Sequence, residues 1–265
     1  GSEMCIRDRP RVKENINIDL SDRREKMIPK IIHYCWFGGE KPQKVVKCIE
    51  SWKKNLPDYE IKEWNKNNFD ISELQYTLDA YKAHKYAFVS DVARVKALYE
   101  YGGIYLDTDV MVYKSFDSIL CHKCVFGFEE EQYVATSFMA CEPQHPLMER
   151  FLFLYYNLSF YDKNGKIIPG TNVEKLTDLL MNMGLERKNQ FQELKENITI
   201  YPQEYFSPYD YSNCIHHNTE NTICEHLFFV SWMSWNTKLK KAIKHILGPL
   251  LGKERMNELR KMRCR

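Results

Sequence analysis

The stretch that decides the fold is FVSDVARVKALYEYGGIYLDTDVMV, residues 88–112. Apolar residues recur at helical spacing up to the glycine pair at 102–103, and an apolar strand over 104–106 then stops at Asp107 and Asp109. Two carboxylates placed two positions apart at a strand end can reach one divalent cation, and open α/β sheets place their ligands at that edge. The pattern therefore predicts an α/β fold with a hard-metal site that stays open for substrate phosphates.

The helix that precedes this strand adds an acid and a base to the same region. Asp91 and Arg94 are three residues apart and share one helical face, while Ser90 is expected to cap the helix at its amino end. An Asp-x-Asp pair alone occurs by chance about once in a chain of this length, and its plain alternative is two solvated aspartates in a turn. The combination is much rarer, so it indicates a functional site.

SDxxR at 90–94 followed by YGGIYLDxD at 101–109 resembles the core signature of the DXD sugar transferases, family 32 of the glycosyltransferases. It is more distantly similar to the catalytic domain of the large glucosylating bacterial toxins. That family includes yeast-type initiating mannosyltransferases and bacterial capsule and lipopolysaccharide transferases. The resemblance implies a GT-A fold with a central mixed sheet flanked by helices, a Mn²⁺ or Mg²⁺ ion, a nucleotide-sugar donor and retention of anomeric configuration.

The same resemblance implies roles for single residues. Asp107, Asp109 and His226 would hold the metal, Arg94 would grip donor oxygens, and Asp91 would accept hydrogen bonds from the donor sugar. Further residues that it places at the donor are Trp36, Tyr105, Asp107, Ser231 and Trp232. Trp36 would stack on the base, with core packing as its plain alternative. A UDP-hexose is the favoured donor on the strength of the toxin-like Trp36 strand, and GDP-mannose is the other option.

The segment HLFFVSW at 226–232 carries the expectation for His226. Relatives show a histidine five residues before a Ser-Trp pair, often as His-His-x-x-x-Ser-Trp. Here Leu227 replaces the second histidine, so the match is partial, and His216 and His217 are rival ligands. A histidine with a satisfied structural role is the plain alternative for each of them. His33, inside the first strand, is interpreted as an internally bonded residue rather than a ligand.

Composition restricts the function further. The 265 residues are 44% hydrophobic, enough for one sizeable core, and the longest apolar run is far too short to span a bilayer. Nine cysteines without regular spacing indicate free thiols and a cytoplasmic setting. The basic residues are concentrated in a tail without interleaved aromatic residues, so nucleic acid is not an expected partner.

Three segments are expected along the chain. Residues 1–26 are interpreted as a non-native leader, because Gly1-Ser2 resembles a tag-cleavage scar and 4–9 resembles a translated sequencing adapter. Residues 27–237 form the catalytic domain. Residues 238–265 hold ten basic and two acidic residues, a charge of +8 that leaves −6 for the rest of a chain of net charge +2. This amphipathic tail suits either peripheral contact with an anionic membrane, on the inner face in a bacterium, or packing as helices on the domain.

Other periodic segments complete the sequence-based expectations. Strands are predicted at 28–37, 59–64, 125–128, 135–141 and 198–202, with 110–112 extending the strand region. Helices are predicted at 42–56, 78–86, 147–160 and 171–180, the last capped by Thr171. The acid run 129–131 is interpreted as a solvated face.

Three other functions fit parts of the pattern. IYLDTDV at 104–110 also matches the motif of haloacid-dehalogenase-type phosphatases, in which Asp107 would be the nucleophile. That family begins with this strand and needs a later paired-acid motif, which is absent after residue 110. A non-catalytic module that binds nucleotide sugars is the second alternative. A toxin-like transferase acting on a protein is the third, whereas polysaccharide or lipid-linked glycan acceptors are favoured.

Overall fold

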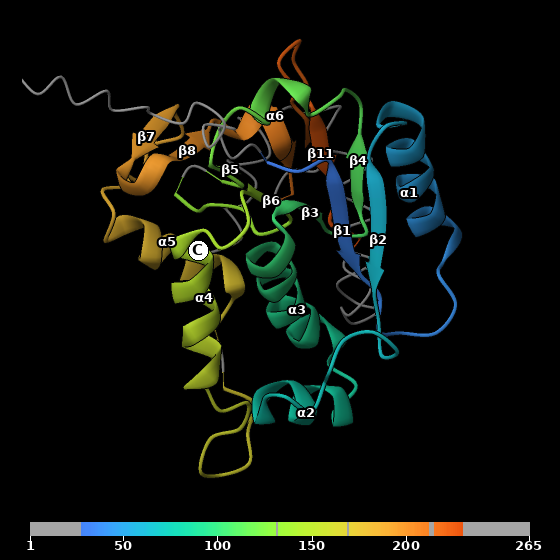
Figure 1. Ribbon diagram of the computed structural model, residues 1–265, viewed down its shortest axis with the longest axis vertical. Helices are drawn as coiled ribbons and strands as arrows, with labels where there is room; N and C mark the ends of the chain where they lie inside the picture. Colours follow the sequence, from blue (N-terminus) through green and yellow to red (C-terminus); the bar gives the residue numbers. More distant parts are fainter. Residues whose placement is uncertain (1–27, 131, 169, 212–214, 230–265) are drawn as a thin grey trace, which may run out of the picture.

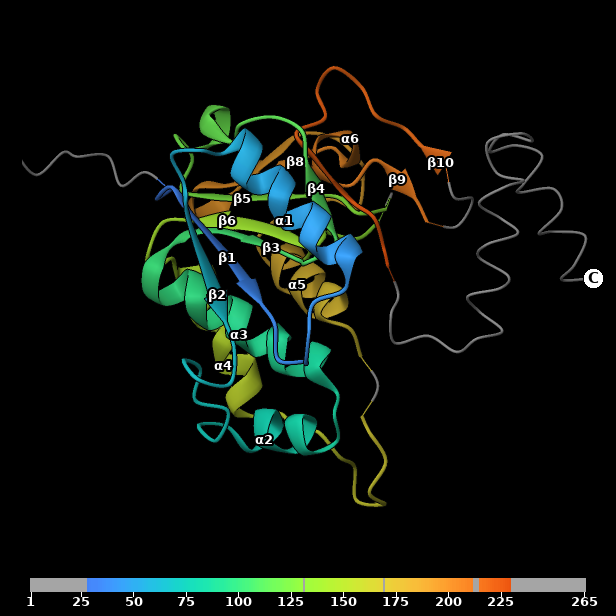
Figure 2. The same cartoon turned by 90° about the vertical axis from the view of Figure 1, so that its right-hand side faces the viewer.

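The protein is built around a mixed seven-stranded β-sheet with helices on both faces (Figures 1 and 2). The structure, a computed structural model, describes residues 28–130, 132–168, 170–211 and 215–229. The strands are β1 (Ile31–Cys35), β2 (Glu60–Trp64), β3 (Gly103–Leu106), β4 (Val110–Val112), β5 (Cys124–Gly127), β6 (Phe138–Cys141), β7 (Gln192–Leu194), β8 (Ile198–Tyr201), β9 (Tyr209–Asp210), β10 (Ile215–His216) and β11 (Cys224–His226). The helices are α1 (Gln43–Asn55), α2 (Gln75–Lys82), α3 (Tyr86–Tyr101), α4 (Pro146–Tyr156), α5 (Asn172–Met181) and α6 (Gln203–Phe206).

The order of strands in the main sheet is β2-β1-β3-β6-β5-β8-β7. β1 runs parallel to β2 and β3, and β5 runs parallel to β8, whereas β6 and β7 are antiparallel to their neighbours. The expected α/β architecture with a central mixed sheet flanked by helices is confirmed. Because β1 and β3 are parallel neighbours, their carboxyl ends meet at one edge of the sheet.

Alternation along the strands divides the core into two apolar layers. Ile32 and Ile104 belong to the layer that contains α1, while Cys35 and Tyr105 belong to the layer that contains α3. Trp52 of α1 is completely buried, and its indole N–H donates to Val110 O at 2.8 Å. Burial of a large side chain is worth several kcal/mol, on the order of 3–5 for Phe or Trp lost to Ala. Trp52 therefore fastens the α1 layer to the chain that follows β3.

Helix α3 begins earlier than the sequence predicts. Its first residue is Tyr86, so Ser90 lies inside the helix, where its hydroxyl donates to Tyr86 O at 3.1 Å. The prediction of Ser90 as an N-cap, with Asp91 at the positive helix end, is wrong. Phe88 and Val89 pack against the apolar core, and this packing extends the helix past the local polar signal.

The glycine pair lets α3 turn directly into β3. Gly102 and Gly103 have φ of 64° and 92°, in the left-handed region that favours glycine. A Cβ on Gly103 would lie 2.6 Å from Ile31 O, so only glycine allows β3 to start this close to β1.

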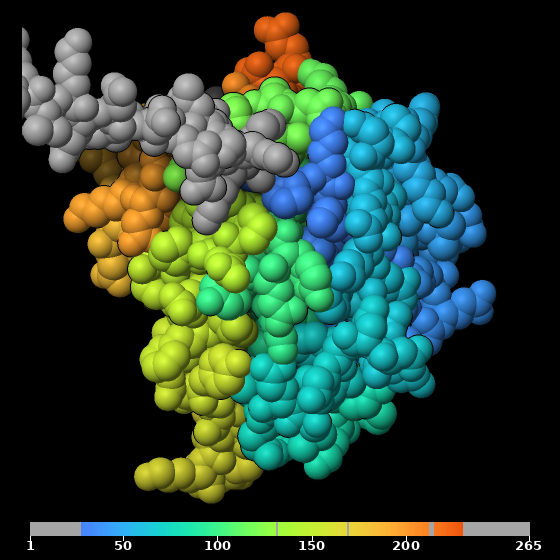
Figure 3. Space-filling view, in the orientation of Figure 1, coloured from blue at the N-terminus to red at the C-terminus, as the bar shows by residue number. Residues whose placement is uncertain are grey.

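The other predicted elements agree with the structure in type and differ in their bounds, whereas β7, α6, β9, β10 and β11 were not predicted. Thr171 caps α5 in a reciprocal capping box with Glu174, as expected. The prediction that residues 110–112 extend the preceding strand is wrong, because β4 leaves the main sheet and pairs antiparallel with β11. The segment between α4 and α5 projects from the body of the molecule (Figure 3).

The terminal segments lie outside the described part of the chain, and some of the cysteines lie within it. The leader 1–26 and the tail 238–265 lie outside the described residues. Six of the cysteines lie within the described residues, and all six are free thiols. Within the described ranges no helix has the length and apolar composition needed to cross a bilayer.

Candidate active site

The loop between β3 and β4 places the two aspartates at the edge where β1 and β3 end. The amide N–H of Asp107 donates to Ser137 O at 2.8 Å, and Val110 N–H closes a turn on Asp107 O at 3.0 Å. The carboxylates of Asp107 and Asp109 therefore hang from a short turn that is fixed at both sides. Both side chains stay partly exposed, at 26% and 17%.

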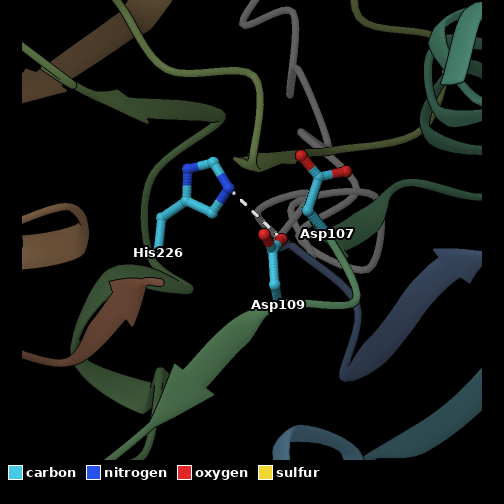
Figure 4. Close-up of side chains that lie close together, drawn as sticks. All are labelled: Asp107, Asp109 and His226. Atoms are coloured by element: carbon cyan, nitrogen blue, oxygen red, sulfur yellow. Dashed lines mark ion pairs between the residues drawn. The ribbon is translucent and has the colours of Figure 1, made fainter. Parts of the chain in front are cut away.

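A distant segment supplies the third side chain. β11 pairs antiparallel with β4, and His226 stands opposite Val110 in the register. Leu227 N–H donates to Asp109 O at 2.9 Å, and Phe229 N–H donates to the Asp109 carboxylate at 2.8 Å. His226 Nε2 consequently lies 3.2 Å from Asp109 Oδ1 (Figure 4). The backbone pairing of β11 with β4 therefore places the His226 imidazole beside the two aspartates.

The donor atoms of Asp107, Asp109 and His226 lie within 4.8 Å of one another. In the described part of the chain this is the one group of His, Cys, Asp and Glu side chains that could hold a metal ion. Two carboxylates and an imidazole form an oxygen-rich set that suits Mn²⁺, and the carboxylates also suit Mg²⁺. The residues present therefore fit the metal that the DXD resemblance implies.

The rival histidines lie elsewhere. His216 Nδ1 pairs with Glu225 at 2.5 Å, and its side chain is 48% exposed. His217 is exposed. Neither belongs to the group formed by the two aspartates, so among the three candidates the geometry favours His226.

The electrostatics of the site reflect crowded carboxylates. Burial opposes a charge on His226, but Asp109, Glu129 and Asp107 together outweigh burial and raise the pKa of His226 to about 9. Burial would raise the pKa of Asp109, yet the His226 imidazolium and the Phe229 N–H lower it to about 2. Without a metal, a protonated imidazole thus neutralises part of the acid cluster.

Arg94 joins the helix to the acid loop. Its guanidinium contacts Asp91 Oδ1 and Asp107 Oδ1 at 3.2 Å each, and Nη1 donates to Thr136 O at 2.7 Å. Its Nε–H donates to Ser90 O at 3.3 Å, and the guanidinium lies over the Tyr105 ring. With 6% of its side chain exposed, Arg94 bridges two carboxylates and also donates to two backbone carbonyls.

Asp91 and Tyr105 complete this bridge. Burial raises the pKa of Asp91 to about 6, although Arg94 acts against that shift. Tyr105 is 1% exposed, and its hydroxyl donates to Asp107 Oδ1 at 2.8 Å. The structure therefore places Tyr105 behind Asp107, where it holds the carboxylate. The Tyr105 hydroxyl and the Arg94 guanidinium together hold the Asp107 carboxylate.

Trp36 follows β1 at the same edge of the sheet. Its indole N–H donates to Gly39 O, and the ring is partly buried against the α1 layer. Lys41 Nζ lies 6.0 Å from the ring centroid. Stacking of the donor base on Trp36 stays a prediction. Ser231 and Trp232, the other expected donor residues, lie outside the described residues.

Glu129 is a site residue that the sequence interpretation missed. The prediction of a solvated acidic face is wrong for Glu129, whose side chain is 15% exposed, and right for Glu130, which is exposed. Glu129 Oε1 lies 4.0 Å from His226 Nδ1. It also borders a cavity of about 310 Å³, lined by Glu129, Glu130, Tyr133, Thr171, Val173 and Glu174. A run of three acids carries no local signal of which member turns inward.

Comparisons with known proteins found a family match and several similar sequences. A family described as "Glycosyltransferase sugar-binding region containing DXD motif" matches residues 42–126, which include the helix with Asp91 and the acid loop. Inositol phosphoceramide mannosyltransferase 3 of Schizosaccharomyces pombe is 29% identical over 55% of this chain and 44% of its own length. Mannosyl phosphorylinositol ceramide synthase CSH1 of Saccharomyces cerevisiae is 26% identical over 84% and 58%. The chain spans about half the length of these curated relatives.

Among solved structures, the chain shows partial similarity to two glycosyltransferases. The glycosyltransferase PaToxG has 19% identity and a TM-score of 0.46, over 59% of this chain and 69% of its own. The galactosyltransferase LgtC has 12% identity and a TM-score of 0.43, over 84% and 96%.

Proposed function

We propose that this chain, whose residues 42–126 belong to the glycosyltransferase family with a DXD-containing sugar-binding region, moves a sugar from a nucleotide-sugar donor to an acceptor hydroxyl. The reaction would depend on a divalent metal and would retain the anomeric configuration. The observation that carries the proposal is the meeting of Asp107, Asp109 and His226 at the carboxyl end of β3. Such an edge is where α/β sheets bind phosphate-bearing ligands.

Each residue has a role that follows from its contacts. Asp107, Asp109 and His226 would hold Mn²⁺ or Mg²⁺, and that ion would act as a Lewis acid toward the departing diphosphate. Arg94 holds the carboxylates of Asp91 and Asp107 in place. Asp91, partly exposed, would accept hydrogen bonds from hydroxyls of the donor sugar. Fixed charges that need no rearrangement are the usual source of most of the rate enhancement.

The donor is proposed to be a nucleotide-linked hexose whose base stacks on Trp36. The toxin-like strand around Trp36 supports a UDP-hexose. The names of the two curated relatives are those of mannosyl-transferring enzymes, which supports GDP-mannose as the competing donor. Both bases present a flat face to an aromatic ring, so the base is decided by experiment.

The acceptor is proposed to be a hydroxyl of a polysaccharide or lipid-linked glycan. The cavity beside Glu129 offers carboxylates and the Tyr133 ring, groups that suit hydroxyls and sugar faces. The composition of residues 238–265 supports peripheral contact with an anionic membrane surface, and the free thiols support a cytoplasmic location.

A thermal-shift screen tests the donor. UDP-glucose, UDP-galactose and GDP-mannose are each added with and without Mn²⁺, and one donor is expected to stabilise the protein only when the metal is present. The same pair should give slow release of the nucleotide by hydrolysis. If no nucleotide sugar shifts the transition and none is hydrolysed, the proposal fails. Hydrolysis of an aryl phosphate instead would favour the phosphatase alternative.

A further inference from the structure

We propose that Glu129 positions His226 for metal binding by accepting a hydrogen bond from the Nδ1–H of its imidazole, an inference that rests on the metal site proposed above. The starting observation is an unsatisfied atom. His226 Nδ1 is buried and has no hydrogen-bond partner among the described residues. A buried polar atom without a partner costs about 1–3 kcal/mol, so its surroundings need an explanation.

The two ring nitrogens of His226 face different groups. Nε2 lies 3.2 Å from Asp109 Oδ1, on the side of the acid pair, whereas Nδ1 lies 4.0 Å from Glu129 Oε1. When one imidazole nitrogen binds a metal, the other usually donates to a carboxylate or carbonyl, which fixes the tautomer and the ring direction. The separation of 4.0 Å is longer than a hydrogen bond. A small rotation of the Glu129 side chain or one bridging water closes it.

The surroundings hold both partners near this arrangement. Glu129 follows the buried residue Phe128, and its amide N–H donates to Tyr133 O at 2.9 Å. The ring of Phe228 packs against the imidazole, with the two planes tilted by 32° and the centroids 3.8 Å apart. Phe228 therefore fixes the plane of the ring, and a carboxylate at Glu129 fixes its direction within that plane.

The test measures Mn²⁺ affinity by electron paramagnetic resonance at one fixed pH in the full chain. Glu129→Ala removes both the acceptor and the charge, and it should weaken Mn²⁺ binding by about 10–100-fold. Glu129→Gln keeps an acceptor oxygen and should recover part of that loss. Glu193→Gln is the matched control, since this exposed carboxylate on β7 is not part of the site and the variant should bind Mn²⁺ like the wild type.

A second readout reports the tautomer directly. In the Mg²⁺-bound protein, nitrogen NMR of the His226 imidazole should show the proton on Nδ1, and Glu129→Ala should lose that single tautomer. Equal Mn²⁺ affinity of Glu129→Ala and wild type, with the tautomer unchanged, overturns the role of Glu129 while leaving the metal site standing. Absence of Mn²⁺ binding by the wild type overturns the proposed function and the inference with it.

Discussion

His33 and His226 are enclosed histidines near the two ends of β3, yet their surroundings drive them to opposite charge states. His33 is completely buried at the start of β3. Its Nε2 lies 2.9 Å from Gly102 O, and its Nδ1 accepts the Trp64 indole N–H at 3.1 Å. An N–H on Nε2 and a bare Nδ1 satisfy both contacts, so the ring is neutral. Burial lowers the pKa of His33 to about 4.

At the other end of β3, carboxylates reverse the outcome. Burial also opposes a charge on His226, but Asp109, Glu129 and Asp107 raise its pKa to about 9. Burial alone therefore does not decide the state of a histidine; the charges around it do. The region around His33 satisfies itself with neutral partners and has no need of a ligand. The carboxylates around Asp107 and Asp109 need positive charge nearby. Arg94 carries a charge that does not titrate, whereas the charge on protonated His226 can be replaced by that of a bound metal ion.

Removal of the permanent charge should have the largest effect. Arg94→Met leaves the enclosed carboxylates of Asp91 and Asp107 without their cation, and it should lower the free energy of unfolding by about 3–5 kcal/mol. Arg94→Lys keeps a charge but not the fork, so it should cost less. Urea denaturation at pH 7 measures both. Arg150→Met, which removes an exposed pair with Glu196, is the control and should cost below about 1 kcal/mol. Similar losses in the free energy of unfolding for Arg94→Met and Arg150→Met would show that Arg94 contributes no more to stability than an exposed arginine.

A substitution at Asp109 tests the positive charge that either protonated His226 or a metal ion supplies. Asp109→Asn keeps an acceptor for Phe229 N–H but removes the negative charge that faces His226. Metal-dependent turnover of the donor should fall by about 10²–10³-fold, the usual cost of one electrostatic group at a reacting centre. Steady-state kinetics over a Mn²⁺ series measure the loss. Asp178→Asn, at a carboxylate that is 71% exposed, should leave the kinetics unchanged. Full activity of Asp109→Asn would remove Asp109 from the metal site.

The two histidines should affect the pH dependence of the free energy of unfolding in opposite ways, His33 on the acid limb of the curve and His226 on the alkaline limb. Below pH 6.5 the unfolded chain protonates at His33, whereas the folded protein does not until about pH 4. The contribution of His33 to the free energy of unfolding should therefore fall by about 3 kcal/mol as the pH drops from 6.5 to 4, while Asp91, whose pKa is raised to about 6, contributes with the opposite sign, so the His33 limb is the difference between the wild type and His33→Gln. In metal-free protein the stabilisation from His226 is fully present below pH 6.5 and is lost as the pH rises through about 9.

Variants separate the two limbs. His33→Gln retains a donor and an acceptor but cannot titrate, so it should flatten the acid limb and leave the alkaline limb. Asp109→Asn should flatten the alkaline limb and leave the acid limb. Denaturation curves from pH 4 to 9.5 with a chelator present measure both. A single variant that flattens both limbs would show that the two regions are coupled.

The contrast also explains what the sequence could predict. The run 101–109 shows the glycine turn, the buried strand and the acid pair within one short window, so local pattern sufficed for β3 and the sheet class. His226 was expected through a family pattern, because its position depends on the pairing of β11 with β4, which no local signal encodes. Glu129 was missed for the same reason: its contact with His226 joins segments far apart in the chain. The helix start at Tyr86 was misplaced because tertiary packing overrode a plausible cap at Ser90.

The smallest predicted effect isolates one hydrogen bond at His33. Trp64→Phe removes the indole N–H that is donated to Nδ1, the nitrogen on which an added proton would sit. A proton there no longer meets a competing donor, so the pKa of His33 should rise, and the acid limb should shrink by about 1 kcal/mol.

Loss of core volume also destabilises this variant, but that loss does not depend on pH. Trp52→Phe separates the two effects, since it too loses an indole N–H bond and buried volume, yet the bond lies at Val110 O and away from His33. The informative quantity is therefore the difference between the free energies of unfolding at pH 7.5 and pH 5. That difference should shrink in Trp64→Phe and keep its wild-type value in Trp52→Phe. Equal pH dependence in the two variants would mean that burial by itself, without the Trp64 hydrogen bond, keeps His33 neutral.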